Sequence, residues 1–289
     1  MRVYLTGGTG LIGSHVAERL RARGDDVVAL VRPTSDTSHL RAIGCDLVHG
    51  DARDDVAAQT ARMRGCAAVI HCAARVFTGG SRATFLADNV EGTERVLAAA
   101  SEVAPRVIHL SSVAVYSGLP MDGRPLTEER WTEADPDRQN AYAASKHLSE
   151  RAAWAFHQQG RVRLTTLRPC VVYGERDRAA TPLIVRYATL PVVPLLAGGR
   201  PWLPLVYAGN VAAGVAAALD RPETAGRAYN LARDERVTAR ELARWIAEEL
   251  DRRRLRLPIP AVIPAAAATF LRRLAPIAPR LAPGGVIRA

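Results

Sequence analysis

Val3-Tyr4-Leu5-Thr6, followed by Gly7-Gly8-Thr9-Gly10-Leu11-Ile12-Gly13, is the stretch that decides the fold. The first four residues are a short apolar run typical of a buried strand, and a helical pattern follows the glycines to about Arg23. A glycine-rich turn in this position predicts a dinucleotide site, because the pyrophosphate lies on the helix N-terminus and side chains would block its approach. The residues expected to hold the cofactor here are Gly7, Thr9, Gly10, Leu11, Ile12 and Gly13.

Strand and helix patterns alternate along the chain as far as Arg168. The apolar runs predict strands over 27–31, 46–49, 68–71, 106–110 and 163–168, and the helical patterns lie over 54–63, 83–102 and 140–159. This alternation predicts an α/β fold with a doubly wound parallel sheet of the Rossmann type. After Pro169 the pattern changes, and prolines and glycines cluster over 182–204. We therefore expect an NADP-binding Rossmann domain over 1–169 and a smaller C-terminal substrate lobe over 170–289, interleaved with the first domain.

The composition is that of an ordinary globular protein. The chain has 289 residues, of which 48% are hydrophobic and 24% charged, which excludes a disordered chain, a collagen and a small disulfide scaffold. No apolar run reaches the roughly 18 residues that a membrane span needs. The N-terminus runs straight into the first strand, which predicts no signal peptide and a cytoplasmic location. The four cysteines and seven histidines show no metal-ligand spacing, so no metal site is expected.

The net charge of +10 is unevenly distributed. Residues 252–289 contain eight arginines and no acidic residue, so the rest of the chain is nearly neutral. No stripe of interleaved aromatic and basic residues is present, which argues against nucleic-acid binding. A basic, apolar tail is expected to lie on the protein itself, on a partner or on an anionic membrane surface.

Lys146 is the only lysine among 39 basic residues. Arginine serves wherever a generic positive charge suffices, so this lysine is expected where a compact ammonium is required. It follows Tyr142 by four residues, and on a helix these two positions share one face. An ammonium beside a phenol lowers the pKa of the phenol and favours the phenolate, as general acid–base catalysis requires. The same lysine can hold the nicotinamide ribose.

Three further positions follow the ends of predicted strands. Arg32 stands where an NAD-selective site has a carboxylate, and an arginine there suits a 2′-phosphate, which predicts NADP in preference to NAD. Asp51 and Ala52 follow the third strand beside the expected adenine pocket. Ser112 follows the fifth strand, where its hydroxyl can donate to a substrate oxygen while Tyr142 moves the proton. The alternatives are a solvated surface arginine, an exposed turn aspartate and a strand-end cap.

Taken together, these motifs resemble the extended short-chain dehydrogenase/reductase superfamily, which includes the NAD-dependent epimerase/dehydratase family. The resemblance covers about residues 1–250. The matching pieces are 6–13, Gly50-Asp51, His71-Cys-Ala-Ala74, Asn89-Val-Glu-Gly-Thr93, Ser111-Ser112, Tyr142–Lys146, Leu167-Arg-Pro169 and Val206-Tyr-Ala-Gly-Asn210.

The resemblance also implies roles for individual residues. Ser112, Tyr142 and Lys146 would be the catalytic triad. Asn89 would lie near the cofactor ribose, and Pro169 would pack by the nicotinamide. The residues implied to line the cofactor are Cys72, Ala73 and Ala74. Family members often form homodimers through the helices near 84–102 and 140–158, so a homodimer is expected.

Departures from the family pattern narrow the reaction. Val113 and Ala114 stand where dehydratases carry an acidic pair. Val171 and Leu203 stand where sugar epimerases carry an asparagine and an arginine for nucleotide phosphate. Apolar segments expected to face the substrate are Val76-Phe77, Trp131, 171–173 and Trp202-Leu203.

These features are most similar to the hydroxysteroid dehydrogenase-like and dihydroflavonol reductase-like branch. The expected activity is that of an NAD(P)-dependent oxidoreductase acting on the carbonyl or secondary alcohol of an apolar small molecule. The alternatives are an NAD-dependent nucleotide-sugar epimerase and a non-catalytic dinucleotide-binding protein.

Overall fold

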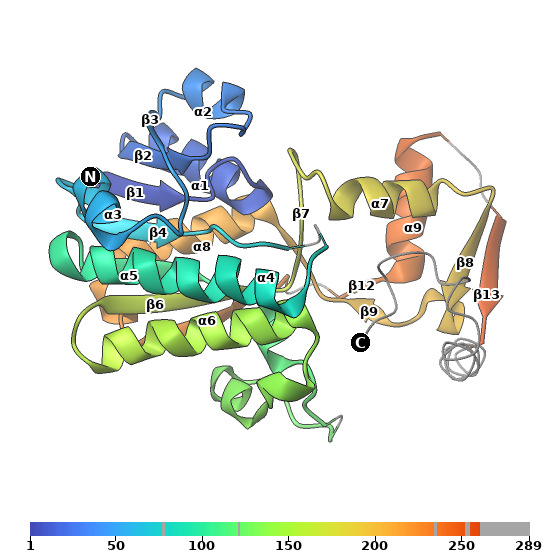
Figure 1. Cartoon of the computed structure of the whole chain (residues 1–289). Coiled ribbons are helices and arrows are strands. Elements are labelled where there is room, and N and C mark those ends of the chain that lie inside the picture. Colours follow the sequence, from blue (N-terminus) through green and yellow to red (C-terminus); the bar gives the residue numbers. More distant parts are fainter. Residues whose placement is uncertain (77–78, 121, 234–235, 252–254, 261–289) are drawn as a thin grey trace. The chain divides into compact units, whose positions relative to one another are not determined.

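The computed structural model describes residues 1–76, 79–120, 122–233, 236–251 and 255–260 (Figure 1). The chain divides into two compact units. Unit 1 consists of Met1–Asp177 and Val206–Ala232, and unit 2 contains Arg178–Leu205 and the described residues from Arg233 onward. The segment 206–232 follows the predicted boundary at residue 169 in sequence but packs within unit 1.

Unit 1 is built on a sheet of seven parallel strands in the order β11-β6-β5-β4-β1-β2-β3. The strands are β1 (Arg2–Thr6), β2 (Asp26–Val31), β3 (Asp46–His49), β4 (Ala68–His71), β5 (Arg106–Leu110), β6 (Arg163–Pro169) and β11 (Arg227–Leu231). The predicted doubly wound fold is confirmed. The strand order reverses at β1, which lies between β2 and β4, and a ligand crevice is expected beyond the carboxyl ends of the strands at such a point.

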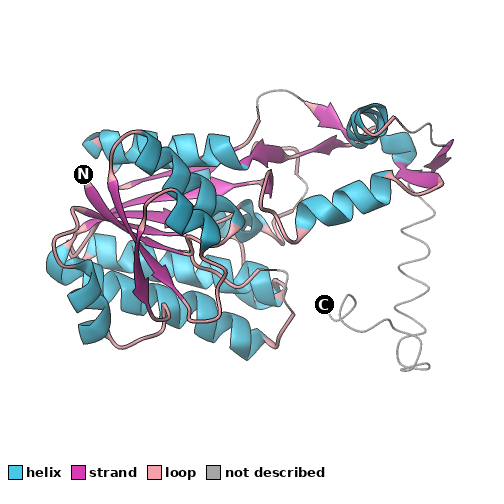
Figure 2. Ribbon diagram, turned by 90° about the horizontal axis from the view of Figure 1, so that it is seen from above, coloured by secondary structure: helices cyan, strands magenta, loops and turns pink. Residues whose placement is uncertain are grey.

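Helices cover both faces of this sheet (Figure 2). One face carries α1 (Leu11–Ala22), α2 (Ser38–Ala42) and α8 (Ala208–Asp220), and the other carries α3 (Val56–Met63), α4 (Arg82–Leu86), α5 (Gly92–Val103) and α6 (Ala141–Gln158). The inner strands therefore bury both of their faces, which is why they read as continuous apolar runs, whereas the edge strands β3 and β11 are partly exposed. In β1, for example, Val3 and Leu5 enter the core beneath α1 and α8, while Tyr4 enters the core beneath α5 and α6.

Shorter elements complete unit 1. A π-helical turn, Ala87–Glu91, joins α4 to α5, so the single helix predicted over 83–102 is interrupted. Turns of 3-10 helix lie at Val113–Tyr116, Glu128–Glu133, Pro136–Arg138 and Pro222–Thr224. Strands β7 (Val171–Tyr173) and β10 (Leu205–Tyr207) form a separate pair.

Unit 2 is smaller, and its described residues form two short strand pairs and two helices. Its elements are α7 (Ala180–Ala188), β8 (Val192–Leu196), a 3-10 turn at Ala197–Gly199, β9 (Trp202–Leu203), β12 (Val237–Thr238), α9 (Ala239–Glu249) and β13 (Leu255–Ile259). Strand β13 pairs with β8 in parallel, and β12 pairs with β9 antiparallel. Helix α9 begins with a capping box between Thr238 and Glu241.

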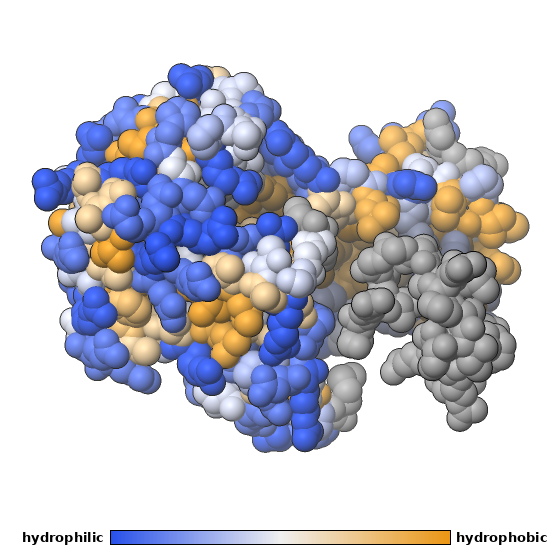
Figure 3. All heavy atoms as spheres, in the orientation of Figure 1, coloured by the Kyte–Doolittle hydropathy of each residue, from blue (hydrophilic) through white to orange (hydrophobic). Residues whose placement is uncertain are grey.

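Exposed large apolar side chains are concentrated in unit 2, and Figure 3 shows apolar residues gathered on the drawn face of that unit. Within unit 2, the most exposed of these apolar side chains are Leu183, Leu196, Trp202, Leu255 and Leu257. In the part of the chain that the structure describes, no helix has both the length and the apolar character needed to cross a bilayer.

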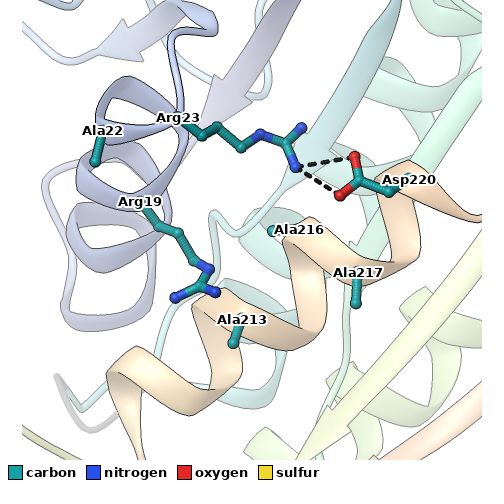
Figure 4. Close-up of a pocket in the computed structure, with 7 residues that line it drawn as sticks. All are labelled: Arg19, Ala22, Arg23, Ala213, Ala216, Ala217 and Asp220. Atoms are coloured by element: carbon teal, nitrogen blue, oxygen red, sulfur yellow. Dashed lines mark hydrogen bonds and ion pairs between the residues drawn. The ribbon is translucent and has the colours of Figure 1, made fainter.

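An open pocket lies between α1 and α8 (Figure 4). Alanines of α8 form its floor, and the Arg23 guanidinium donates to both carboxylate oxygens of Asp220 at 2.9 and 3.0 Å. The pocket is at the C-terminal end of α1, whereas the glycine turn is at the N-terminal end. None of the predicted site residues lines it.

Candidate active site

The glycine turn between β1 and α1 packs directly against the segment that follows β4. Gly7 has a φ of +71°, and a Cβ there would lie 2.6 Å from Ala73 N and 2.7 Å from the carbonyl carbon of Cys72. A Cβ on Gly13 would lie 2.1 Å from Gly7 O. These clashes are all with backbone atoms, so glycine is required at both positions.

The first turn of α1 is suited to an anion. Gly10 is the N-cap residue, none of the described side chains caps this end, and the first turn contains no acidic residue. Its backbone N–H groups and the positive end of the helix dipole are the features that bind phosphate. The residues present therefore fit a dinucleotide pyrophosphate.

Thr6 connects the glycine turn to the end of β4. Its carbonyl accepts from Cys72 N at 3.2 Å, and its hydroxyl accepts from Ala73 N at 3.1 Å and contacts His71 Nδ1 at 2.7 Å. Burial raises the pKa of the Cys72 thiol to about 12, so the thiol stays protonated. The structure thus places Cys72 and Ala73 against the turn, while Ala74 is exposed.

Tyr142 and Lys146 lie in the first turns of α6. The Lys146 side chain is 3% exposed, and its ammonium donates to Leu110 O, at the end of β5, at 2.7 Å. Burial lowers the pKa of Lys146 to about 8, and the negative charge of Glu150 opposes this shift. Burial likewise raises the pKa of Tyr142, and a hydrogen bond with the Ser112 side chain opposes that effect.

The expected lowering of the Tyr142 pKa by Lys146 is therefore wrong for this structure. The ammonium is directed to the Leu110 carbonyl, and the loss of solvent around the phenol decides the direction. The phenol is consequently held in its protonated form.

Ser112 combines both roles considered for it. As the N-cap of the 3-10 turn after β5, its hydroxyl accepts from Ala114 N at 3.1 Å. The same side chain hydrogen-bonds Tyr142. It thereby brings the predicted serine and tyrosine together at the carboxyl edge of the sheet, and α6 adds Lys146 beside them.

Asn89 lies in the π-helical turn and is 2% exposed. Its Oδ1 accepts from Arg75 N at 2.6 Å, and its Nδ2 donates to Arg75 O at 3.1 Å and to Ser145 Oγ at 2.8 Å. The side chain therefore ties the segment after β4 to the helical turn between Tyr142 and Lys146. Single π-helical turns inside helices are frequent at functional sites.

The residues predicted for the adenosine half of the cofactor lie after neighbouring strands. Arg32 is exposed after β2, and no side-chain hydrogen bond or ion pair joins it to another described residue. Asp51 follows β3, and its Oδ1 accepts from Arg53 N at 3.0 Å and Nε at 3.3 Å. Ala52 lies against the start of α5, 3.5 Å from the position of a Cβ on Gly92.

Pro169 is buried at the end of β6, and it pairs in register with Leu231 of the neighbouring strand β11. Of the apolar segments expected to face substrate, Trp131 packs on His147, with ring centroids 5.0 Å apart. Trp202 belongs to unit 2 and stacks under Arg236, whose guanidinium carbon is 3.8 Å from the ring centroid. Phe77 lies outside the described residues. The residues that the structure describes contain no cluster of three or more metal-ligating side chains.

The sequence analysis missed Glu150 and the contacts of Arg168. Both side chains are fully buried and form an ion pair beneath the site. One signal was available: Glu150 follows Lys146 by four residues on the same helix, the spacing that had already linked Tyr142 to Lys146.

Comparison with known proteins is consistent with this geometry. The family model described as "NAD dependent epimerase/dehydratase family" matches residues 3–232. A 4-hydroxy-2-methyl-3-oxo-4-farnesyl-3,4-dihydroquinoline-1-oxide ketoreductase of Stigmatella aurantiaca is 31% identical over 76% of this chain and 65% of its own. A 2-alkyl-3-oxoalkanoate reductase of Shewanella oneidensis is 26% identical over 84% of this chain and 64% of its own. The chain thus spans slightly less than two thirds of the length of either relative.

Among solved structures, a UDP-glucose 4-epimerase of Thermus thermophilus in complex with NAD superposes with a TM-score of 0.71 at 28% identity. The match covers 90% of this chain and 86% of the epimerase.

Proposed function

This chain belongs to the NAD dependent epimerase/dehydratase family, and on that premise we propose that it is an NAD(P)-dependent oxidoreductase. It would transfer a hydride between nicotinamide and the carbonyl or secondary alcohol carbon of an apolar small molecule. The observation that carries this proposal is the buried Lys146 ammonium one helical turn from a Tyr142 phenol that is hydrogen-bonded to Ser112.

Each residue has a definite task in this reaction. The glycine turn and the α1 N-terminus would hold the pyrophosphate, and the bound nicotinamide supplies or accepts the hydride. During reduction, Ser112 donates to the substrate oxygen, and Tyr142 gives that oxygen its proton. The raised pKa of Tyr142 keeps the phenol protonated, as a proton donor in the reduction requires. Lys146, with a pKa of about 8, stays largely charged near neutral pH and stabilises the phenolate that remains.

Substitution of Tyr142 tests the chemistry directly. Tyr142→Phe removes the proton donor and should lower turnover of a reducible ketone by about 10²-fold or more, with cofactor affinity unchanged. Tyr229→Phe is a matched control, since that ring packs against the core and none of the described residues hydrogen-bonds its hydroxyl. Near-normal turnover by Tyr142→Phe would exclude this mechanism.

We propose NADP as the preferred cofactor because Arg32 is exposed after β2 with no ion pair to another described residue. Titration with NADPH and NADH should show tighter binding of NADPH, and Arg32→Ala should remove that difference while leaving NADH binding unchanged. Arg41→Ala, on the exposed surface of the nearby α2, serves as the control. Equal affinities for the two cofactors in the wild type would refute the preference.

The apolar substrate class is supported by the sequence and by two relatives. Val171 and Leu203 replace the polar residues that bind nucleotide phosphate in sugar epimerases. The two relatives are named as reductases of a farnesylated quinoline oxide ketone and of alkyl-oxoalkanoates. A panel of ketones graded by chain length should show kcat/KM rising with apolar length.

The alternative is a nucleotide-sugar epimerase, favoured by the likeness to the NAD-bound UDP-glucose 4-epimerase. Such an enzyme recycles its cofactor within one catalytic cycle. Release of stoichiometric NAD on denaturation of the purified protein would support the epimerase over the reductase.

We further propose a cytoplasmic homodimer that pairs through the α5 and α6 side of unit 1, and a peripheral membrane contact through the basic residues 252–289. Light scattering tests the dimer. Flotation with anionic liposomes, with and without the tail, tests the membrane contact, and equal recovery of the two forms would exclude it.

A further inference from the structure

Glu150 and Arg168 form an ion pair in which both side chains are 0% exposed. Arg168 Nε donates to both carboxylate oxygens at 3.0 Å, and Arg168 Nη2 donates to Oε1 at 2.5 Å. The pair joins α6 to β6 inside the core of unit 1. Removing two charges from water is costly, so such a pair is weak evidence for a purely stabilising role.

The remaining hydrogen-bonding capacity of the pair is directed to the surrounding elements. Ser111 Oγ donates to Glu150 Oε2 at 2.5 Å, and Trp154 Nε1 donates to Oε1 at 3.1 Å. Arg168 Nη1 donates to Tyr116 Oη and to Glu128 O, both at 2.6 Å. The pair therefore fixes the segments that follow β5 as well as α6.

These contacts lie next to the residues assigned to catalysis. Ser111 is the residue between Leu110, whose carbonyl holds the Lys146 ammonium, and Ser112, which is bonded to Tyr142. On α6, Glu150 is one turn beyond Lys146, at the spacing that places both side chains on one helix face. A single carboxylate thus holds the strand end that carries Ser112 and lies beside the lysine.

Glu150 is also the anion of this environment. The titratable and charged side chains around Lys146 come from four elements: Tyr142 and Glu150 of α6, His71 and Cys72 at the end of β4, His109 of β5 and Arg168 of β6. Burial keeps both histidines neutral and the two remaining acids, the phenol and the thiol, protonated. The Glu150 carboxylate is therefore the negative charge that opposes the lowering of the Lys146 pKa.

We propose that the Glu150–Arg168 pair is a positioning unit of the catalytic centre: Glu150 anchors the strand end that presents Ser112 and supplies the negative charge that holds Lys146 as an ammonium, while Arg168 limits that charge. The inference rests on the proposed function, in which Ser112 and Lys146 are catalytic residues. Its electrostatic part can be measured without turnover.

The single lysine makes this measurement direct. Protein grown with ¹³C-lysine and carrying a lysine-free tag gives one lysine side-chain signal, whose chemical shift against pH reports the Lys146 pKa. In the wild type the midpoint is expected at about 8. Glu150→Gln should lower it by about one pH unit, because a neighbouring opposite charge is lost, and Arg168→Gln should raise it, because Glu150 is no longer compensated.

The opposite signs separate electrostatic coupling from general damage, which would move both variants in one direction. Glu94→Gln, an exposed carboxylate on α5, is the control and should leave the midpoint unchanged. Shifts of equal sign, or no shift in Glu150→Gln, would overturn the proposal. If one of the two variants fails to fold, the other still carries a signed prediction, and an absent shift or a shift of the opposite sign in that variant would overturn the proposal.

The anchoring part is tested by Ser111→Ala. It should lower kcat by about tenfold at unchanged cofactor affinity, since displacement of a catalytic group by a fraction of an ångström is costly. Ser101→Ala is the control, because that hydroxyl donates to Ala98 O of its own helix and accepts from the exposed Arg161 side chain, with no contact to the strand end that carries Ser112. An unchanged kcat in Ser111→Ala would remove the anchoring role, whereas absence of turnover in the wild type would instead contradict the proposed function.

Discussion

Substitution of Gly13 by alanine adds a single Cβ atom to the glycine turn and so tests whether this turn binds the cofactor. The new Cβ would lie 2.1 Å from Gly7 O and 2.9 Å from Gly8 Cα, so the turn must move by about 1 Å to restore van der Waals contact. Such a displacement removes at least one backbone hydrogen bond to the pyrophosphate. A hydrogen bond to a charged group contributes about 1.5–3 kcal/mol, which corresponds to a rise in Kd of about 10- to 150-fold.

The matched control is Gly92→Ala. Gly92 also lies in a helix, but its Cβ would be 3.5 Å from Ala52 Cβ, an ordinary contact. Alanine there should leave cofactor affinity unchanged and raise the free energy of unfolding by about 0.5–1 kcal/mol. NADPH and NADH affinities are measured by calorimetric titration, with thermal unfolding as the folding check. A folded Gly13→Ala variant that binds cofactor within twofold of the wild type would refute the assignment of the turn.

Three further predictions concern buried polar groups. The folded-state pKa of Lys146 is lowered to about 8, so the free energy of unfolding should rise by about 3 kcal/mol as the pH increases from about 8 to 10.5. Urea unfolding of the wild type and of Lys146→Met over this pH range measures the difference. Parallel pH profiles of the two proteins would contradict the prediction. Burial lowers the pKa of His71 to about 3, so the free energy of unfolding should fall by about 3 kcal/mol when the pH is lowered from about 6.5 to 4. In the same assay, His71→Gln should reduce this loss of stability at acidic pH. Asn89→Ala should cost about 1–3 kcal/mol, because it leaves buried partners unsatisfied, and an unchanged thermal midpoint would show that water replaces the amide.

The main sheet was largely predictable because its strands are short apolar runs ended by glycine or polar residues. The strands over 46–49, 68–71 and 106–110 have the predicted bounds. In the last two, burial on both faces leaves a continuous apolar signal, whereas the partly exposed strand over 46–49 shows it only at Leu47 and Val48. Helix α7 was not predicted, because the sequence over 182–204 shows a cluster of prolines and glycines in place of a clear helical pattern. Pro182 stands in the first turn of α7, where its missing N–H would have no intrahelical partner.

The site was only partly predictable. Local spacing and the single lysine indicated Tyr142 and Lys146, but the direction of the Tyr142 pKa depended on the burial of the phenol, which the spacing does not reveal. The Glu150–Arg168 pair joins residues 18 positions apart, and the contact of Tyr116 Oη with Asn230 Oδ1 joins residues 114 apart. Such contacts depend on strand order, which the periodicity of one sequence does not specify.

The packing of Gly7 on Ala73 has a consequence for protein engineering. The phosphate turn and the stretch 71–75 touch backbone to backbone and share Thr6 as a common hydrogen-bonding partner. We therefore expect that the two stretches can be exchanged with those of a related protein only together, although about sixty residues separate them in the sequence. Transplanting the turn alone from another member of the family would leave mismatched backbone surfaces, whereas moving both stretches together would preserve the fit.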